Sequence, residues 1–312
     1  MAGQQLKDLA LAYSRRDDRR FRAVFAGIIA DEEAKKHGAL AAELRRLVGA
    51  APAQSVPPVP VDRESNLPLL AVHTREPVLG KLALSADASA AVQRVLDDVK
   101  FGSKLEAGGL PRRNKVLLFG PPGCGKTSVA AAIGAELGRR VLVLRPEGMI
   151  SSFLGKTAAN LLQIFEYLDS GEYVLLIDEF DTIGADRDTS DTTGEMRRLT
   201  NSLLQQVEGY RGPSIILAAT NRPEILDSAL WRRFDQVIEM PLPSLQQIEA
   251  VIATVMGYEL QNGAEQLVGL PHAAAEYFAQ SIRRNALFND HIVALRSDID
   301  AALTETLGRR WA

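Results

Sequence analysis

The residues best suited to chemistry form one short run rich in glycine. In order they are Gly120, Pro121, Pro122, Gly123, Cys124, Gly125, Lys126, Thr127 and Ser128. The run matches the pattern G-x-x-x-x-G-K-[ST] and stands between a strand-like and a helix-like stretch. Glycines let the backbone wrap a phosphate, and free amides of the loop and helix start point at the anion. Lys126 can reach β- and γ-phosphates and the Thr127 hydroxyl can bind Mg²⁺, so the run predicts a triphosphate site.

Two acids end a second apolar run, at Asp178 and Glu179. They come about fifty residues after the phosphate loop, at the end of a predicted strand, where ligands of open α/β sheets bind. Asp178 fits an Mg²⁺ position, through water, and Glu179 fits the general base that orients and polarises an attacking water. The alternative, a pair of acids that only caps the next helix, is less consistent with the phosphate loop upstream.

A third polar group follows the predicted strand 214–220. Asn221 would hold the same water as the acid pair, although it could also simply begin a turn before Arg222 and Pro223. Arg232 and Arg233 come next. As residues alone, they are equally well surface charges or groups that stabilise transition-state charge on a neighbouring subunit's γ-phosphate.

These groups need a sheet to position them, and the chain predicts one. Short runs rich in Val, Ile and Leu alternate with helical stretches, which indicates a parallel α/β sheet. The predicted strands lie within 115–120, 139–145, 173–180, 214–220 and 236–240. The fold class is therefore a P-loop type, five-stranded parallel sheet with helices on both faces. We expect the α/β nucleotide-binding domain at 71–243 and a small all-α domain at 244–312, with Ser244 as a helix cap.

The segments before residue 71 have a different character. Residues 1–50 show helical spacing of apolar residues and a crowd of arginines, which is either a solvated helix face or a docking surface for a partner or substrate. Residues 51–70 are rich in proline, which lacks the amide donor and fixes φ. They predict a semi-stiff linker.

Composition narrows the class of protein. The chain has 312 residues, a net charge of −3 and one cysteine. An acidic balance gives no support to nucleic-acid binding. A single cysteine rules out an intrachain disulfide and fits a reducing compartment. The sequence shows no signal peptide and no membrane span, so the expected location is the cytoplasm.

Taken together, the motifs resemble the AAA ATPase family, within the wider AAA+ class, over residues 75–312. GPPGCGKT resembles its Walker A, LLIDEF its Walker B, and ATNRPEILDSALWRRFD its second region of homology. The resemblance gives Asn221 the sensor role and Arg232 and Arg233 the paired arginine positions. The usual Pro-Gly between those arginines is missing, as in spastin- and katanin-type members, which leaves their relative importance open.

The resemblance also implies a pore loop and a lid. Phe153, Leu154 and Gly155 match the aromatic-aliphatic-Gly loop with which family hexamers grip an unfolded polypeptide, although Phe153 could instead be a core residue. The C-terminal helices resemble the family's lid. Residues 269–274 stand where many members carry a Gly-Ala-Asp contact to nucleotide; the acid is absent, and no site is assigned there.

The arrangement as a whole is similar to small bacterial AAA ATPases encoded beside subtilisin-like serine proteases in phage-defence loci. The expected function is an ATP-hydrolysing hexameric ring, with ATP and Mg²⁺, that threads or remodels polypeptides and works with a partner such as a serine protease. The alternative is an ATP-dependent assembly switch that regulates a partner protease without threading. Nucleic acid and membrane are not expected partners.

Overall fold

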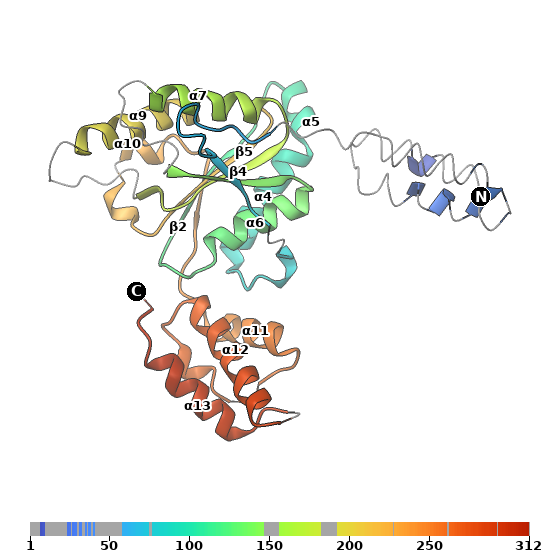
Figure 1. Ribbon diagram of the computed structural model, residues 1–312, viewed down its shortest axis with the longest axis vertical. Coiled ribbons are helices and arrows are strands. Elements are labelled where there is room, and N and C mark those ends of the chain that lie inside the picture. The colour runs from blue at the N-terminus through green and yellow to red at the C-terminus, as the bar shows by residue number, and fades with distance from the viewer. Residues whose placement is uncertain are drawn as a thin grey trace. The chain divides into compact units, whose positions relative to one another are not determined.

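The computed structural model describes two units of the chain, Met1–Pro58 and Val59–Ala312, each treated by itself below (Figure 1). In the second unit the described ranges are 59–74, 77–146, 156–181, 192–226, 228–260, 262–291 and 293–311. In the first unit they are 7–9, 24–25, 27–29, 31–32, 35, 37–38, 40 and 58.

The first unit is helical at most of its described positions, including 7–9, 24–25, 27–29 and 31–32. At the end of this stretch the Glu32 carboxylate accepts hydrogen bonds from Lys35 Nζ and His37 Nδ1, each at 2.7 Å. These positions have the helical conformation that the spacing of apolar residues predicts. The docking role of residues 1–50 stays a prediction.

The second unit is built on a six-stranded sheet with the order β1-β3-β4-β5-β2-β6. Its strands are β1 Leu70–Val72, β2 Lys115–Phe119, β3 Arg140–Leu144, β4 Tyr173–Ile177, β5 Ile215–Thr220 and β6 Gln236–Glu239. The five predicted strands are present and parallel, so the mixed α/β class is confirmed. The strand count was one too low, because β1 adds an antiparallel edge strand against β3.

The order of the strands brings the chemical groups to one edge. Strand β5 lies between β4 and β2, and Phe119 pairs with Thr220 while Ile177 pairs with Ala218. The three strands therefore end close together at their carboxyl ends. The phosphate loop, the acid pair and Asn221 each follow directly on one of these ends, which is where open α/β sheets bind ligands.

Helices cover both faces of the sheet (Figure 1). Helices α4 Ala86–Lys100 and α6 Lys126–Leu137 pack on one face, where alternate strand residues such as Leu118, Leu176 and Leu217 are buried. Figure 1 shows α7 Lys156–Asp169 and α9 Thr192–Gly209 over the other face. Strand residues on both faces are apolar, as buried parallel strands require. The shorter helices are α5 Gly102–Ala107 and α10 Ser228–Trp231, with 3-10 turns at Leu79–Lys81 and Pro223–Ile225.

The predicted linker, 51–70, reaches into the second unit at its C-terminal end. Val61 and Pro68 form an isolated bridge, and Leu69 is fully buried. Asp62 accepts a hydrogen bond from Asn160 Nδ2 at 2.9 Å, and hydrogen bonding holds the pKa of this carboxyl well below its usual range. Apolar residues after the last proline thus dock this segment onto the sheet domain.

The C-terminal helices are α11 Leu245–Met256, α12 His272–Phe288 and α13 Arg296–Leu307, with a 3-10 turn at Glu265–Leu267. They enclose a core of their own around Ile252, Phe278 and Ile282. Ser244 caps α11, as its sequence position predicts, in a reciprocal capping box with Gln247. In the described part of the chain no helix is long and apolar enough to cross a bilayer.

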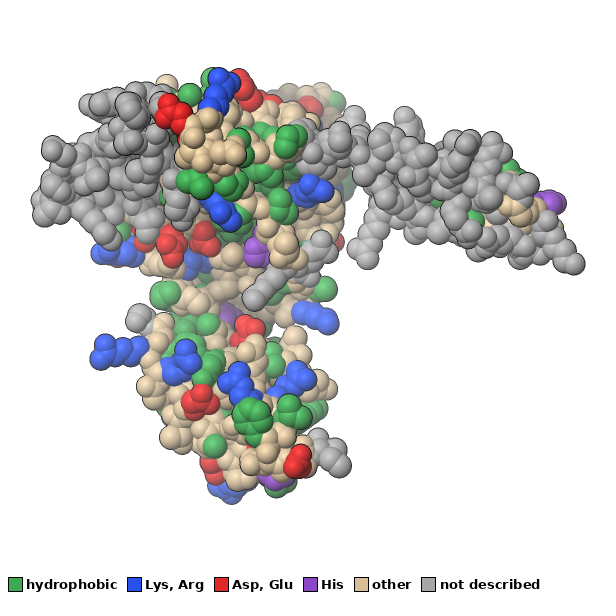
Figure 2. All heavy atoms as spheres, viewed as in Figure 1, with side chains coloured by type: hydrophobic (Ala, Val, Ile, Leu, Met, Phe, Trp, Pro, Cys, Tyr) green, Lys and Arg blue, Asp and Glu red, His purple; other side chains and the backbone are tan. Residues whose placement is uncertain are grey.

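Charged side chains of both signs are interspersed over the described residues of the face shown in Figure 2. Nucleic-acid binding rests on neutralising many phosphates at once. The expectation that nucleic acid is not a partner stays a prediction.

Candidate functional site

The phosphate loop has the backbone geometry that its glycines predict. Gly120 and Gly125 have positive φ angles of 139° and 88°. A Cβ at Gly120 would lie 2.2 Å from the Met240 carbonyl oxygen, whereas one at Gly125 would meet no atom within 4 Å, so glycine is needed there for its backbone conformation. Helix α6 begins at Lys126, and its N-cap Gly125 offers no side-chain acceptor. The amides of this helix start therefore remain available to an anion.

Lys126 is folded into the loop. Its Nζ donates hydrogen bonds to the carbonyl oxygens of Gly120 and Pro121, at 2.8 and 2.9 Å. Burial lowers the pKa of this ammonium, because a charge is costly away from water. A bound phosphate would supply the anionic partner that favours the charged form.

Thr127 and Asp178, the two residues predicted to bind Mg²⁺, are in contact. Thr127 Oγ1 donates to Asp178 Oδ2 at 2.7 Å, and the other carboxylate oxygen accepts from the Glu179 amide at 2.9 Å. A hydroxyl beside a carboxylate is the kind of oxygen donor set that Mg²⁺ takes at phosphate sites. These residues fit the predicted ion, which when bound would neutralise charge on the phosphates.

Glu179 directly follows Asp178 in a turn at the end of β4. Its backbone has φ 49°, in the left-handed region that residues other than glycine seldom adopt. The residue is exposed and lines the pocket described below. This position suits a carboxylate that orients and deprotonates a water molecule.

Asp181 is a functional candidate that sequence reasoning missed. Its Oδ1 accepts hydrogen bonds from Thr220 Oγ1 at 3.0 Å and from the Asn221 amide at 3.3 Å. The side chain is 8% exposed. It thus ties the turn that carries Glu179 to the turn that carries Asn221. Its place three residues after Asp178, on the first turn of the following helix, was the available signal.

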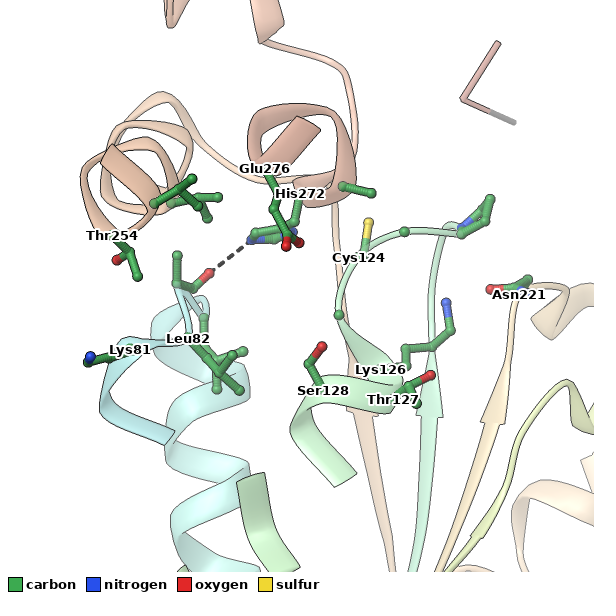
Figure 3. A pocket seen from close by; sticks show the side chains of 18 of the residues that line it. Lys81, Leu82, Cys124, Lys126, Thr127, Ser128, Asn221, Thr254, His272 and Glu276 are labelled. Carbon is green, nitrogen blue, oxygen red and sulfur yellow. Dashed lines mark hydrogen bonds between the residues drawn. The ribbon is translucent and has the colours of Figure 1, made fainter. Parts of the chain in front are cut away.

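One cavity of about 560 Å³, within the range of small-molecule sites, brings together the start of α6, the acid pair and Asn221, whereas Asp181 is not among its lining residues. It is lined by Lys81, Leu82, Ala83, Leu84, Pro122, Gly123, Cys124, Gly125, Lys126, Thr127, Ser128, Asp178, Glu179, Asn221, Val251, Thr254, Val255, His272, Ala273 and Glu276. In Figure 3, Lys126, Thr127 and Asn221 lie at one end, and Lys81, Leu82 and Thr254 at the other. The first end suits phosphates. The second, with aliphatic side chains on both walls, suits a flat base.

The C-terminal helices contribute part of the wall, although no site was assigned at 269–274. The Ala273 amide donates to the Gly123 carbonyl oxygen at 3.0 Å. His272 Nε2 bonds the Ala83 carbonyl oxygen at 3.0 Å, and burial lowers the pKa of this imidazole. Without the family's acid, the sequence lacked a signal here; the contact comes from small residues and a histidine.

Cys124 is packed beneath these helices. It is 1% exposed, and burial raises the pKa of its thiol. In Figure 3 its sulfur lies on the side of the loop that faces His272. A protonated, buried thiol is a weak nucleophile, so Cys124 fits its interpretation as a small residue within the loop.

The two arginines do not line the cavity. Arg232 is exposed just after α10, and Arg233 Nε donates to Glu208 Oε2 at 3.0 Å. Asp235 Oδ2 anchors the following turn by accepting from the amides of Asn114 and Lys115. The predicted pore-loop residues Phe153, Leu154 and Gly155 lie outside the described residues.

Comparison with known proteins gives consistent findings. A family model described as "ATPase family associated with various cellular activities (AAA)" matches residues 116–242. The chain is 35% identical over 252 residues to an uncharacterized AAA family ATPase, y4kL, of Sinorhizobium fredii, covering 79% of this chain and 76% of that protein.

Two further relatives are longer proteins. A proteasome-activating nucleotidase of Pyrococcus furiosus is 32% identical over 67% of this chain and 56% of its own length. The ATP-dependent zinc metalloprotease FtsH 1 of Alkaliphilus metalliredigens is 32% identical over 70% of this chain and 38% of its own length. The chain thus spans about half or less of these two proteins.

Proposed function

Because the chain belongs to the AAA family of ATPases, we propose that it forms a hexameric ring that uses ATP hydrolysis to remodel or thread polypeptides. ATP hydrolysis with Mg²⁺ is the activity of the family and of this chain. The ring, the polypeptide substrate and the partner are the parts proposed.

One observation supports the proposed assembly into a ring. The phosphate loop, the acid pair and Asn221 meet in a single cavity, while Arg232 and Arg233 do not line it. Transition-state charge on the γ-phosphate calls for a further cation. A second copy of the chain would supply it across a head-to-tail interface, and such interfaces close into rings.

The two arginines differ in the interactions that each would lose on reaching a neighbouring subunit. Arg232 is exposed, whereas Arg233 is engaged by Glu208 of its own chain. Arg232 therefore reaches a neighbouring site at lower cost. Arg233 either leaves Glu208 on assembly or holds the turn that presents Arg232.

Two relatives support a polypeptide substrate. One is named as activating a proteasome and the other as an ATP-dependent protease. By analogy with these two relatives, this chain would deliver polypeptide substrates to a protease. The resemblance to small bacterial AAA ATPases encoded beside subtilisin-like serine proteases supports a serine protease partner, in a cytoplasmic defence role.

Complementation between subunits tests the ring. Subunits with both Arg232→Ala and Arg233→Ala keep an intact phosphate loop. Subunits with Lys126→Ala keep both arginines. Each alone should be inactive, and mixing them should restore part of the ATPase rate. Failure to recover activity in mixtures shown to co-assemble would contradict action between subunits.

Stimulation of the ATPase by an unfolded protein tests threading. Phe153→Ala should keep ATP binding and assembly but lose this stimulation. Phe101→Ala is the matched control, because it makes the same substitution at an aromatic residue that is 57% exposed, at the junction of α4 and α5. If Phe153→Ala kept full stimulation, the assembly switch would replace the threading model.

A further inference from the structure

The carbonyl oxygen of Ala83, just before α4, receives two hydrogen bonds from the C-terminal helices. Gln247 Nε2 donates at 2.8 Å from α11, and His272 Nε2 bonds at 3.0 Å from the start of α12. A carbonyl oxygen has two lone pairs, so these two donors satisfy it fully. Figure 3 draws the His272 bond across the cavity wall beside Leu82.

The Gln247 side chain is fixed at both ends. Its Oε1 accepts from the Ser244 amide at 2.9 Å within the capping box, which leaves the NH₂ group to face Ala83. The amide orientation follows from this network, because the oxygen can only accept and the nitrogen can only donate. Gln247 therefore does two jobs, helix capping and the bond to Ala83.

The second ring nitrogen of His272 has no hydrogen-bond partner among the described residues. Burial lowers the pKa of this imidazole, which favours the neutral ring. In the tautomer that donates from Nε2 to Ala83, Nδ1 is left as an acceptor. Nδ1 is buried and has no hydrogen-bond partner among the described residues. An unsatisfied buried acceptor is unfavourable, which argues that the Nε2 bond serves a purpose.

The location of these bonds points to that purpose. Leu82 and Leu84 line one wall of the cavity, and Val251 and Val255 of α11 line another. The bonds to Ala83 join these two walls. The phosphate end depends on other groups: Lys126, Thr127 and Asp178 all come from the sheet domain, and the contact of α12 with the phosphate loop, from the Ala273 amide to the Gly123 carbonyl oxygen, uses backbone atoms.

We propose that Gln247 and His272 are positioning residues for the base end of the ATP site. They hold residues 82–84 against α11 and α12, and so keep open a preformed slot for the planar base and its sugar. Preorganised walls reduce the entropy lost on binding. This inference rests on the ATP site within the proposed function but requires neither a ring nor a polypeptide substrate.

A base-dependent affinity measurement tests the inference. ADP and inorganic tripolyphosphate are titrated calorimetrically into the full-length protein, because both occupy the phosphate loop and only ADP has a base. Gln247→Glu keeps the capping oxygen but replaces the donor with a carboxylate that faces Ala83. Gln246→Glu is the matched control, with the same charge change on an exposed neighbouring residue.

Gln247→Glu and His272→Ala should each weaken ADP binding about 3- to 10-fold, the range of one hydrogen bond. They should raise KM for ATP with little change in kcat, and leave tripolyphosphate binding unchanged. His272→Gln keeps a donor and should recover most of the affinity, which also covers a His272→Ala variant that folds poorly. Equal losses for ADP and tripolyphosphate, or unchanged ADP binding in Gln247→Glu, would overturn the proposal.

Discussion

Replacing Asp181 by asparagine should slow hydrolysis without weakening ATP binding. The substitution keeps the shape of the side chain and removes its charge. Asp181 lines no part of the cavity but holds Thr220 and the Asn221 amide. Its effect on the reaction should therefore pass through the position of Asn221.

The size of the effect follows from the two hydrogen bonds. Bonds to a charged group contribute about 1.5–3 kcal/mol and neutral ones about 0.5–1.5 kcal/mol. Neutralising the acceptor therefore costs about 1–1.5 kcal/mol for the 3.0 Å bond and less for the 3.3 Å bond. Only the part of this energy that is lost in the transition state lowers kcat, so a total of about 1.5–2 kcal/mol sets an upper limit of about 10- to 30-fold on the loss, at 1.36 kcal/mol per factor of ten.

The assay is steady-state ATPase activity together with binding of a fluorescent ATP analogue. Measurements cover Asp181→Asn, Asn221→Ala and the double variant, and thermal melting confirms that each is folded. If Asp181 acts through Asn221, the double variant should be no slower than Asn221→Ala. Full additivity in the double variant, or normal kcat in Asp181→Asn, would refute this reasoning.

Three further outcomes are expected. Lys126→Ala should abolish nucleotide binding, whereas Glu179→Gln should bind ATP normally by titration and lose about 10²–10⁴-fold in kcat, because the glutamate acts only on the water. Cys124 should react with a maleimide far more slowly than the same thiol in denatured protein, and more slowly still with ATP, while Cys124→Ser keeps its ATPase rate. Burial depresses the pKa of His272, so its contribution to stability is full above pH ~6.5 and declines as pH falls below it. Urea unfolding at two pH values should show this loss in the wild type and a smaller one in His272→Gln.

Much of the sheet could be predicted, because buried parallel strands leave continuous apolar runs in the sequence. Strand β1 was missed for the opposite reason. It has three residues, pairs only on one side, and follows a proline-rich stretch that favours a linker. Short edge strands are decided by tertiary contacts, here the burial of Leu69 and Leu70.

The residues of the candidate site also differ in whether the sequence could predict them, and for the same reason. Residues of the phosphate loop and the acid pair were accessible because their chemistry demands a fixed local spacing. Gln247 and His272 meet at the Ala83 carbonyl from positions 164 and 189 residues away. No local pattern encodes such a meeting, because it depends on how the C-terminal helices pack. The pore loop and the N-terminal region stay predictions from the sequence.

The left-handed backbone conformation of Glu179 lowers the stability of the fold, whereas its carboxylate is the predicted general base for ATP hydrolysis. An L-residue in this region costs about 1–2 kcal/mol, and glycine avoids that cost while adding about 0.5–1 kcal/mol of unfolded-chain entropy. On backbone conformation alone, a glycine at this position would leave the fold as stable or slightly more stable, but it would have no carboxylate. Variant libraries ranked by heat resistance alone would therefore enrich an inactive enzyme at this position. Any thermostabilisation of this protein needs turnover as a second selection criterion.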